Sequence, residues 1–121
     1  MKIILGFILL ALFAASSKAG ATEEDSSDGK YLLRSCAVSV RIFDNLLQNE
    51  TIDDAWRHGL CSGLVAGIMF ASPMVCHEPG VSVEQGIRVV EKFLRDHPEK
   101  LRLKGTRLAN EALSQSFPCK Q

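Results

Sequence analysis

The sequence predicts an all-α protein: a small bundle of about four helices, closed by two disulfides, after a cleaved signal peptide. Three observations lead to this prediction. Apolar residues recur every three or four positions over several segments, which is the spacing of one helix face. Four cysteines occur in a chain of only 121 residues. The N-terminus consists of an early lysine followed by an uninterrupted apolar run.

Residues 1–21 have the layout of a secretory signal peptide. Lys2 supplies the positive start, residues 3–15 are apolar and uncharged, and Ala19 and Ala21 each end a small-residue cleavage pattern. The apolar run covers about 13 residues, whereas a membrane-spanning helix needs about 20. We therefore expect cleavage rather than a membrane anchor, no membrane span in the mature chain, and export from the cytoplasm.

The mature chain is expected to contain one domain. Residues 22–30 are small, acidic and polar, which predicts a flexible N-terminus. Residues 31–121 are predicted to form a single helical domain, since about 100 residues bury one modest core. The sequence has 14 basic and 14 acidic residues, so loss of Lys2 and Lys18 leaves the mature chain slightly acidic. This balance argues against nucleic acid as a partner.

The first helix is predicted over residues 31–48. Its apolar positions share one face: they are Leu32, Cys36, Val40, Phe43 and Leu47. A second helix is predicted over residues 52–71, because Thr51 and Asp54 have the spacing of a capping box.

The second helix is expected to lie buried at the centre of the domain. Residues 60–76 contain no charge, and the helix becomes apolar on all sides. Gly59, Gly63 and Gly67 recur every four residues, which leaves a groove for a close neighbouring backbone. We expect that neighbour to belong to the same domain.

Residues 72–81 hold two prolines, a glycine and Cys76, which predicts an irregular connection tethered by the cysteine. Ser82 and Gln85 repeat the capping-box spacing, and helical periodicity continues to Asp96. Pro98 ends that helix and suits the start of another, predicted over residues 99–114. The inner face of this last helix is expected to include Leu101, Leu108, Ala112 and Phe117.

All four cysteines lie in the mature chain, where an even number indicates two disulfides. Short links favour antiparallel neighbouring helices, and folding the chain near residue 49 would bring Cys36 level with Cys61. Folding near residue 98 would bring Cys76 toward Cys119. These pairs are preferred, but four cysteines permit three connectivities, and Cys36–Cys76 with Cys61–Cys119 is nearly as reasonable.

The sequence offers no catalytic group, metal site or cofactor motif. Cys61-Ser62-Gly63 lies inside a predicted helix, not in the sharp turn that presents a nucleophile. None of the histidines has ligand spacing to a cysteine; they are His58, His77 and His97. We therefore expect a binding protein without cofactor or metal, and not an enzyme.

Several motifs occur together along residues 31–120. They are Leu33 to Cys36, Cys61-Ser62-Gly63 with Gly67, the CHEPGVS run at 76–82, the FLRDHPE run at 93–99, Ala112-Leu113, and Phe117-Pro118-Cys119. In this order they resemble the Tai family, also called Rap, of periplasmic immunity proteins. Members of that family neutralise peptidoglycan amidases delivered by type VI secretion.

The resemblance implies a homodimeric helical protein that blocks the catalytic groove of a cell-wall amidase, a Cys/His hydrolase, in the periplasm. Such an inhibitor needs a rigid projecting element, because ordering a floppy one would subtract from affinity. Residues 72–81 fit this need, and the side chains expected to contact the amidase are Met74, Val75, His77 and Glu78. The alternative is that this loop only connects two helices and covers the core.

Two other functions compete with immunity. A small periplasmic chaperone or stress protein would expose its apolar core in acid, yet two disulfides favour a fixed surface. A secreted enzyme is the third possibility, and the lack of a catalytic constellation makes it the least favoured.

Overall fold

The computed structural model describes residues 25–120, so the predicted signal peptide and residues 22–24 lie outside the described part. Four α-helices follow one another: α2 (Gly29–Phe43), α3 (Ile52–Ala71), α4 (Val83–Asp96) and α5 (Gly105–Ser116), with a short 3-10 helix η1 (Pro98–Lys100) before the last. Within residues 25–120 there is no strand, and a single β-bridge joins Asp28 to Lys104. The all-α prediction is confirmed.

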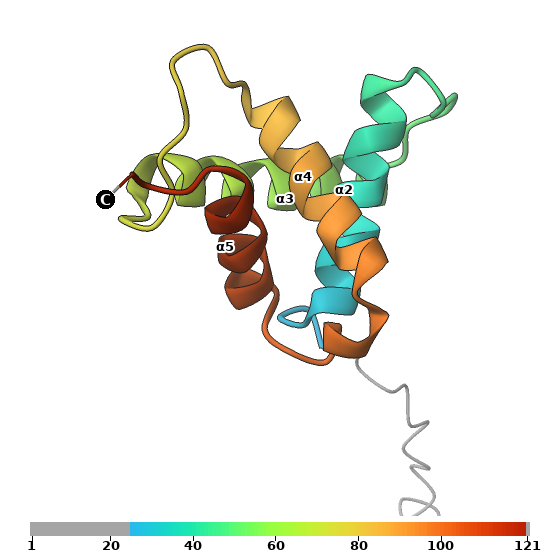
Figure 1. Ribbon diagram of the computed structural model, residues 1–121. Helices are drawn as coiled ribbons and strands as arrows, with labels where there is room; N and C mark the ends of the chain where they lie inside the picture. Colours follow the sequence, from blue (N-terminus) through green and yellow to red (C-terminus); the bar gives the residue numbers. More distant parts are fainter. Residues whose placement is uncertain (1–24, 121) are drawn as a thin grey trace, which may run out of the picture.

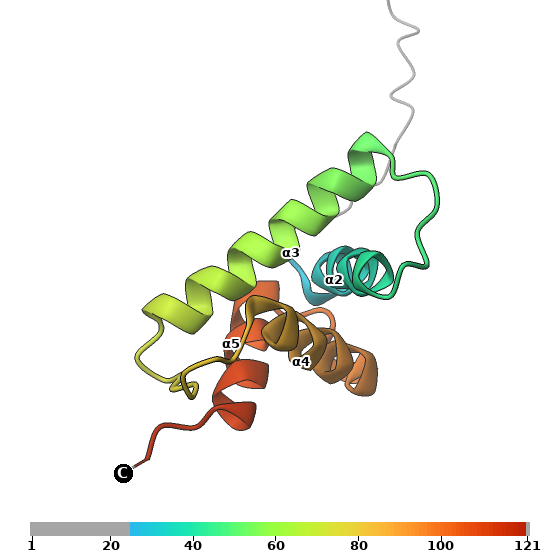
Figure 2. The same ribbon diagram turned by 90° about the horizontal axis from the view of Figure 1, so that it is seen from above.

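The helices form two layers. In Figure 1, α2, α4 and α5 run in broadly similar directions, while α3 lies across them. Figure 2 shows that α2 and α4 lie against one side of α3, whereas its opposite side faces away from the other helices. α3 therefore crosses α2 instead of forming the antiparallel hairpin that the short connection suggested.

One apolar core holds the layers together, and every helix contributes to it. Its largest buried side chains are Ile87, Leu94, Leu108, Leu113, Val65 and Val90. The disulfide between Cys36 and Cys61 lies within this core, where both cysteines are fully buried. It joins α2 to α3 at the point where the two helices cross.

Both predicted capping boxes are present. The N–H of Asp54 donates to Thr51 Oγ1 over 3.1 Å, and the N–H of Thr51 donates to Asp54 Oδ2 over 3.0 Å. Ser82 and Gln85 form the same pair of bonds at α4. Side-chain oxygens thus satisfy exposed amides at both helix starts. The predicted range 52–71 for α3 is confirmed.

The first helix begins and ends earlier than predicted. Asp28 caps α2 by accepting the Tyr31 N–H over 2.9 Å, so residues 28–30 belong to the ordered domain rather than to a flexible N-terminus. The helix ends at Phe43, not at residue 48. Asn45 adopts a φ of 54°, and this left-handed conformation breaks the helical path.

The predicted last helix over residues 99–114 is wrong. The chain forms η1, turns, and starts α5 only at Gly105. Gly105 is buried, and its N–H donates to the carbonyl of Ser27 over 2.8 Å. A Cβ at residue 105 would lie 3.1 Å from the carbonyl oxygen of Asp28, which is a tight contact, so this close approach favours glycine.

The expectation that α3 is buried on all sides is also wrong. Its buried residues are Cys61, Val65 and Met69, which face the core. The three glycines do not pack inside the domain, because a Cβ built on any of them meets no described atom within 4 Å. No helix among the described residues has the length and apolar character needed to cross a membrane.

Candidate partner-binding loop

The connection between α3 and α4, residues 72–81, is fixed to the body of the protein by covalent and hydrogen bonds; we call it the clamped loop. Cys76 forms a disulfide with Cys119, with the two Cα atoms 4.8 Å apart. Beside this bond, the N–H of Cys76 donates to the carbonyl of Phe117 over 2.9 Å. The structure thus shows both preferred disulfide pairs, Cys36–Cys61 and Cys76–Cys119.

The first half of the clamped loop is also tied to α5. Ser72 Oγ donates to Asn110 Oδ1 over 2.7 Å, and Asn110 Nδ2 lies 3.9 Å from Met74 Sδ. Val75 is only 6% exposed and packs into the core. The prediction that Val75 is available to a partner is therefore wrong. This side chain instead attaches the loop to the apolar core.

The other predicted contact residues lie at the surface. Met74 is 59% exposed, Glu78 is exposed and His77 is half-buried. His77 Nδ1 lies 3.3 Å from the carbonyl oxygen of Glu78, and its ring meets Phe70 edge to face at 5.5 Å between centroids. Gly80 has a φ of 91°, which permits the turn that returns the chain to α4.

Phe70 is a surface residue that was not among the predicted contact residues. It lies in the last turn of α3, is 72% exposed, and contacts the His77 ring edge to face. The sequence signal for its exposure was its position one residue before the end of α3, beside an irregular loop. Its apolar character instead placed it in a helix that was expected to be buried.

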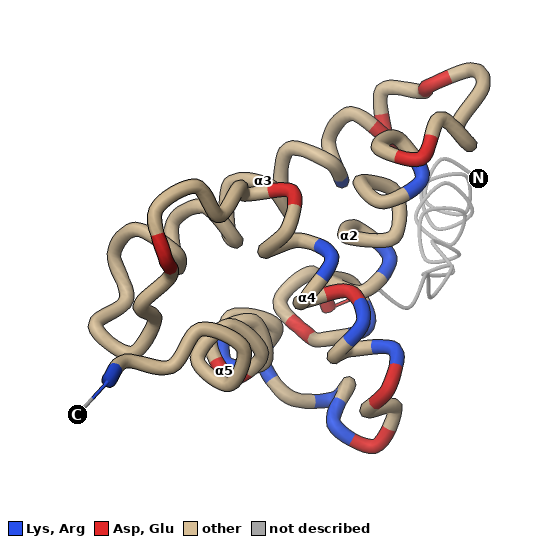
Figure 3. The backbone as a smooth tube through the Cα atoms, turned by 45° about the horizontal axis from the view of Figure 1, so that its top comes forward, with Lys and Arg blue, Asp and Glu red and all other residues tan. Residues whose placement is uncertain are grey.

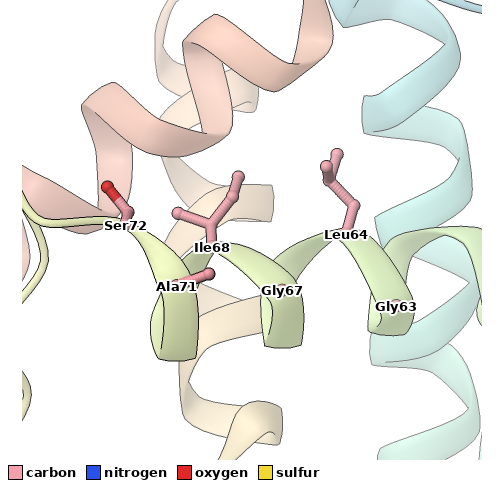
Figure 4. A pocket seen from close by; sticks show the side chains of 6 residues that line it. All are labelled: Gly63, Leu64, Gly67, Ile68, Ala71 and Ser72. Carbon is pink, nitrogen blue, oxygen red and sulfur yellow. The ribbon is translucent and has the colours of Figure 1, made fainter.

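An open hollow adjoins the clamped loop along the flank of α3. It has a volume of about 370 Å³ and ends at Ser72, the first residue of the loop. Its lining comes only from α3 and its C-cap: Gly63, Leu64, Gly67, Ile68, Ala71 and Ser72. Figure 4 shows Leu64 and Ile68 projecting from the same side of the helix, with the backbone bare at Gly63 and Gly67. An apolar side chain of a partner would fit this hollow.

The described residues offer little for catalysis. All four cysteines are in disulfides, and no group of three or more His, Cys, Asp or Glu side chains in this part of the chain could hold a metal ion. His58 Nδ1 lies 2.9 Å from Ser39 Oγ, but Ser39 is fully buried between α2 and α3. That contact joins α3 to α2 through a half-buried histidine and a buried serine, which is a structural use of both side chains.

Charge is distributed unevenly over the surface. Figure 3 shows Lys, Arg, Asp and Glu concentrated along α4 and the turn that leads to α5. In contrast, none of these four residue types occurs between Arg57 and Glu78, a stretch that includes most of α3 and most of the clamped loop. Glu78 is therefore the first of these charged residues after Arg57 in the sequence.

These features define a class of protein: a small, disulfide-bonded, all-helical binding protein with a clamped surface loop. The family of Rap1a immunity proteins matches residues 28–119, and this chain belongs to that family. Membership indicates an immunity protein directed against a toxin, and it confirms the resemblance to the Rap group. The chain matches no curated protein and no solved structure.

Proposed function

We propose that this protein is a periplasmic immunity protein that binds and inhibits a cell-wall amidase delivered by type VI secretion, and so protects the producing cell. The observation that supports this most is the clamped loop, which presents Met74, His77 and Glu78 from a covalently fixed backbone. Family membership supports the immunity role. Two disulfides and the signal-like N-terminus support an oxidising, exported location.

The clamped loop has the mechanical property that an inhibitor needs. Residues that must be ordered on binding subtract from affinity, at about 0.5–1.5 kcal/mol for each immobilised side chain. Here the Cys76–Cys119 bond, the Ser72–Asn110 hydrogen bond and buried Val75 fix the backbone before any partner arrives. Most of that ordering has therefore occurred during folding.

The exposed side chains suit the groove of a Cys/His hydrolase. Met74 is apolar and flexible, so it can fill an irregular cleft. The Glu78 carboxylate can accept a charge-assisted hydrogen bond from a histidine of the amidase. Together these contacts would occupy the groove and exclude the peptide substrate.

A chaperone remains the second candidate, because α3 exposes Ile52, Trp56 and Phe70. Exposed apolar patches are used to bind unfolded chains as well as specific partners. A chaperone would delay the aggregation of unrelated unfolded proteins, whereas an immunity protein would act only on its toxin. An aggregation assay with an unrelated client separates the two: protection of the client would favour the chaperone.

The loop assignment is tested by the triple substitution Met74→Ala, His77→Ala and Glu78→Ala. The matched control is Leu46→Ala, Gln48→Ala and Glu50→Ala, which changes an apolar, a polar and an acidic exposed residue in the loop between α2 and α3. Against an amidase encoded beside this gene, calorimetry should show affinity at least about 100-fold weaker for the first variant, since central contacts each contribute about 2 kcal/mol. The control should bind like the unmodified protein.

Circular dichroism should show both variants folded, since none of the six side chains is buried. If the Met74, His77 and Glu78 variant binds as tightly as the control, the clamped loop does not contact the amidase.

A further inference from the structure

The sulfur atoms of this chain differ in their access to solvent. All four cysteines are held in disulfides, so the described residues contain no free thiol. The sequence has three methionines, of which Met1 belongs to the predicted signal peptide. Met69 and Met74 therefore carry the two thioethers of the expected mature chain.

These two thioethers have opposite surroundings. Met69 in α3 is 3% exposed, and a Cβ built on Gly86 would lie 2.4 Å from its Sδ, so this sulfur packs directly against α4. Met74 in the clamped loop is 59% exposed. Because the oxidation of a sulfur follows its exposure, an oxidant in solution reaches Met74 far more readily than Met69.

The exposed thioether is held in a defined position beside an amide group. The N–H of Met74 donates to Ser72 Oγ over 3.3 Å, and Ser72 Oγ donates to Asn110 Oδ1 over 2.7 Å. Since Oδ1 of Asn110 accepts from Ser72, its Nδ2 faces Met74 Sδ, at 3.9 Å. A hydrogen-bond donor from α5 is therefore directed at the sulfur.

That donor suits an oxidised sulfur better than a reduced one. A thioether is a weak acceptor, whereas a sulfoxide is polar and carries its own oxygen. The oxygen of a sulfoxide at Met74 would accept from Asn110 Nδ2 after a change in side-chain torsion alone. The backbone need not move, because Cys76–Cys119 and buried Val75 fix the loop.

We propose that Met74 is a site of reversible oxidation to methionine sulfoxide by a peroxide, with Asn110 as the donor to the sulfoxide oxygen. The thioether sulfur loses two electrons and gains one oxygen atom. The O–O bond of hydrogen peroxide breaks, an S–O bond forms, and water leaves. Methionine sulfoxide reductases reverse this step with two thiols, which become a disulfide as the oxygen leaves in water.

The effect of this oxidation on binding rests on the proposed function. Met74 is the apolar contact that we assign to the amidase groove. A sulfoxide in its place is polar, so burying it against the amidase carries a desolvation cost. Oxidation therefore weakens the complex while the helical body stays folded.

The site is tested on the mature protein alone, with hydrogen peroxide at neutral pH. This oxidant attacks thioethers and leaves disulfides and indole rings unchanged. Tandem mass spectrometry should show Met74 gaining one oxygen at least about 10-fold faster than Met69 in the folded protein, and at a similar rate in urea. Circular dichroism should stay unchanged while only Met74 is oxidised. Equal rates in the folded protein, or an unreactive Met74, would overturn the proposal.

The role of Asn110 is tested with Asn110→Asp, which keeps an acceptor for Ser72 and removes the donor. The control is Gln115→Glu, the same change of an amide to a carboxylate on the exposed surface of α5. Oxidation of Met74 should lower the melting temperature more in Asn110→Asp than in the control or the unmodified protein. Equal shifts in all three would overturn the role of Asn110.

Amidase binding is measured after the peroxide has been removed. The oxidised protein should bind at least about 10-fold more weakly, and a methionine sulfoxide reductase should restore its affinity. The affinity of Met74→Leu should be the same with and without peroxide treatment. Equal affinity of the oxidised and untreated protein would overturn the effect on binding. An untreated protein that binds no amidase would instead contradict the proposed function and leave the oxidation site intact.

Discussion

Gly86 and Gly63 differ in the space around them, because Gly86 lies in a close helix contact and Gly63 faces open space. A Cβ at Gly86 would lie 2.4 Å from Met69 Sδ and 3.0 Å from Val65 Cγ1, at the contact of α4 with α3. Gly86→Ala should therefore lower the free energy of unfolding by up to about 2 kcal/mol, because the overpacking cost of about 1–3 kcal/mol is offset by the roughly 1 kcal/mol that alanine gains over glycine in a helix. Gly63→Ala meets open space and should raise it by up to about 1 kcal/mol through helix propensity.

Urea denaturation of both variants measures these two changes. The same sign of change for both would contradict the packing described at α3 and α4.

The ion pair between Asp44 and Arg88 links the end of α2 to α4. Arg88 Nη2 donates to Asp44 Oδ1 over 2.7 Å, and this hydrogen bond holds the pKa of Asp44 below its usual value of 3.8. A lowered folded-state pKa contributes stability above the ordinary pKa, and that contribution is lost as the pH falls through the folded-state value.

Asp44→Asn should therefore lower the melting temperature at neutral pH and make little difference in strong acid. Thermal melts from pH 7 to about pH 2 measure this. In an Arg88→Met background the same substitution should have no pH-dependent effect, because the partner is gone. A deficit of Asp44→Asn that persists unchanged into acid would contradict the role of this pair.

At the scale of elements, the two disulfides differ in what they hold. Cys36–Cys61 joins α2 to α3 inside the core, whereas Cys76–Cys119 fixes the clamped loop at the surface. Their sequence separations are 25 and 43 residues, for which chain entropy gives about 3.5 and 4 kcal/mol of stability. Replacing either pair by alanine should lower the free energy of unfolding by roughly those amounts.

Of the two replacements, only that of Cys76–Cys119 should weaken amidase binding in addition to lowering stability. At a temperature where both variants are folded, loss of Cys76–Cys119 should weaken amidase binding, while loss of Cys36–Cys61 should not. Calorimetry on the two variants measures this difference. Equal amidase affinity of the two variants would show that the Cys76–Cys119 disulfide does not order the clamped loop for binding.

The elements that could be predicted from sequence are those fixed by nearby residues. Thr51 with Asp54 and Ser82 with Gln85 define two helix starts through bonds that span three positions, so their spacing was sufficient. The end of α2 was missed because Leu47 continued the apolar period, although Asn45 turns the backbone before it. The break before α5 depends on packing of Gly105 against the distant Asp28 and Leu32.

Exposure could be predicted less well than secondary structure. Periodicity identified α3 from Ile52 to Ala71, but an apolar sequence does not say which of its sides another helix covers. Val75 and Phe70 illustrate this, since the first was expected at the surface and is buried, while the second was assigned to the core and is exposed. Which residues can meet a partner was therefore decided by tertiary packing.

At the scale of the whole molecule, the clamped loop and the exposed side of α3 adjoin one another. The loop carries Met74, His77 and Glu78, which we propose contact an amidase, and α3 exposes Trp56 and Phe70. The Phe70–His77 ring contact connects the two surfaces.

The proposed inhibition is tested most directly by hydrolysis of purified peptidoglycan by an amidase encoded beside this gene, with increasing amounts of the mature protein. We predict that hydrolysis falls in proportion to added protein and stops at one chain per amidase. Undiminished hydrolysis with excess folded protein would contradict the proposal that this protein neutralises a cell-wall amidase.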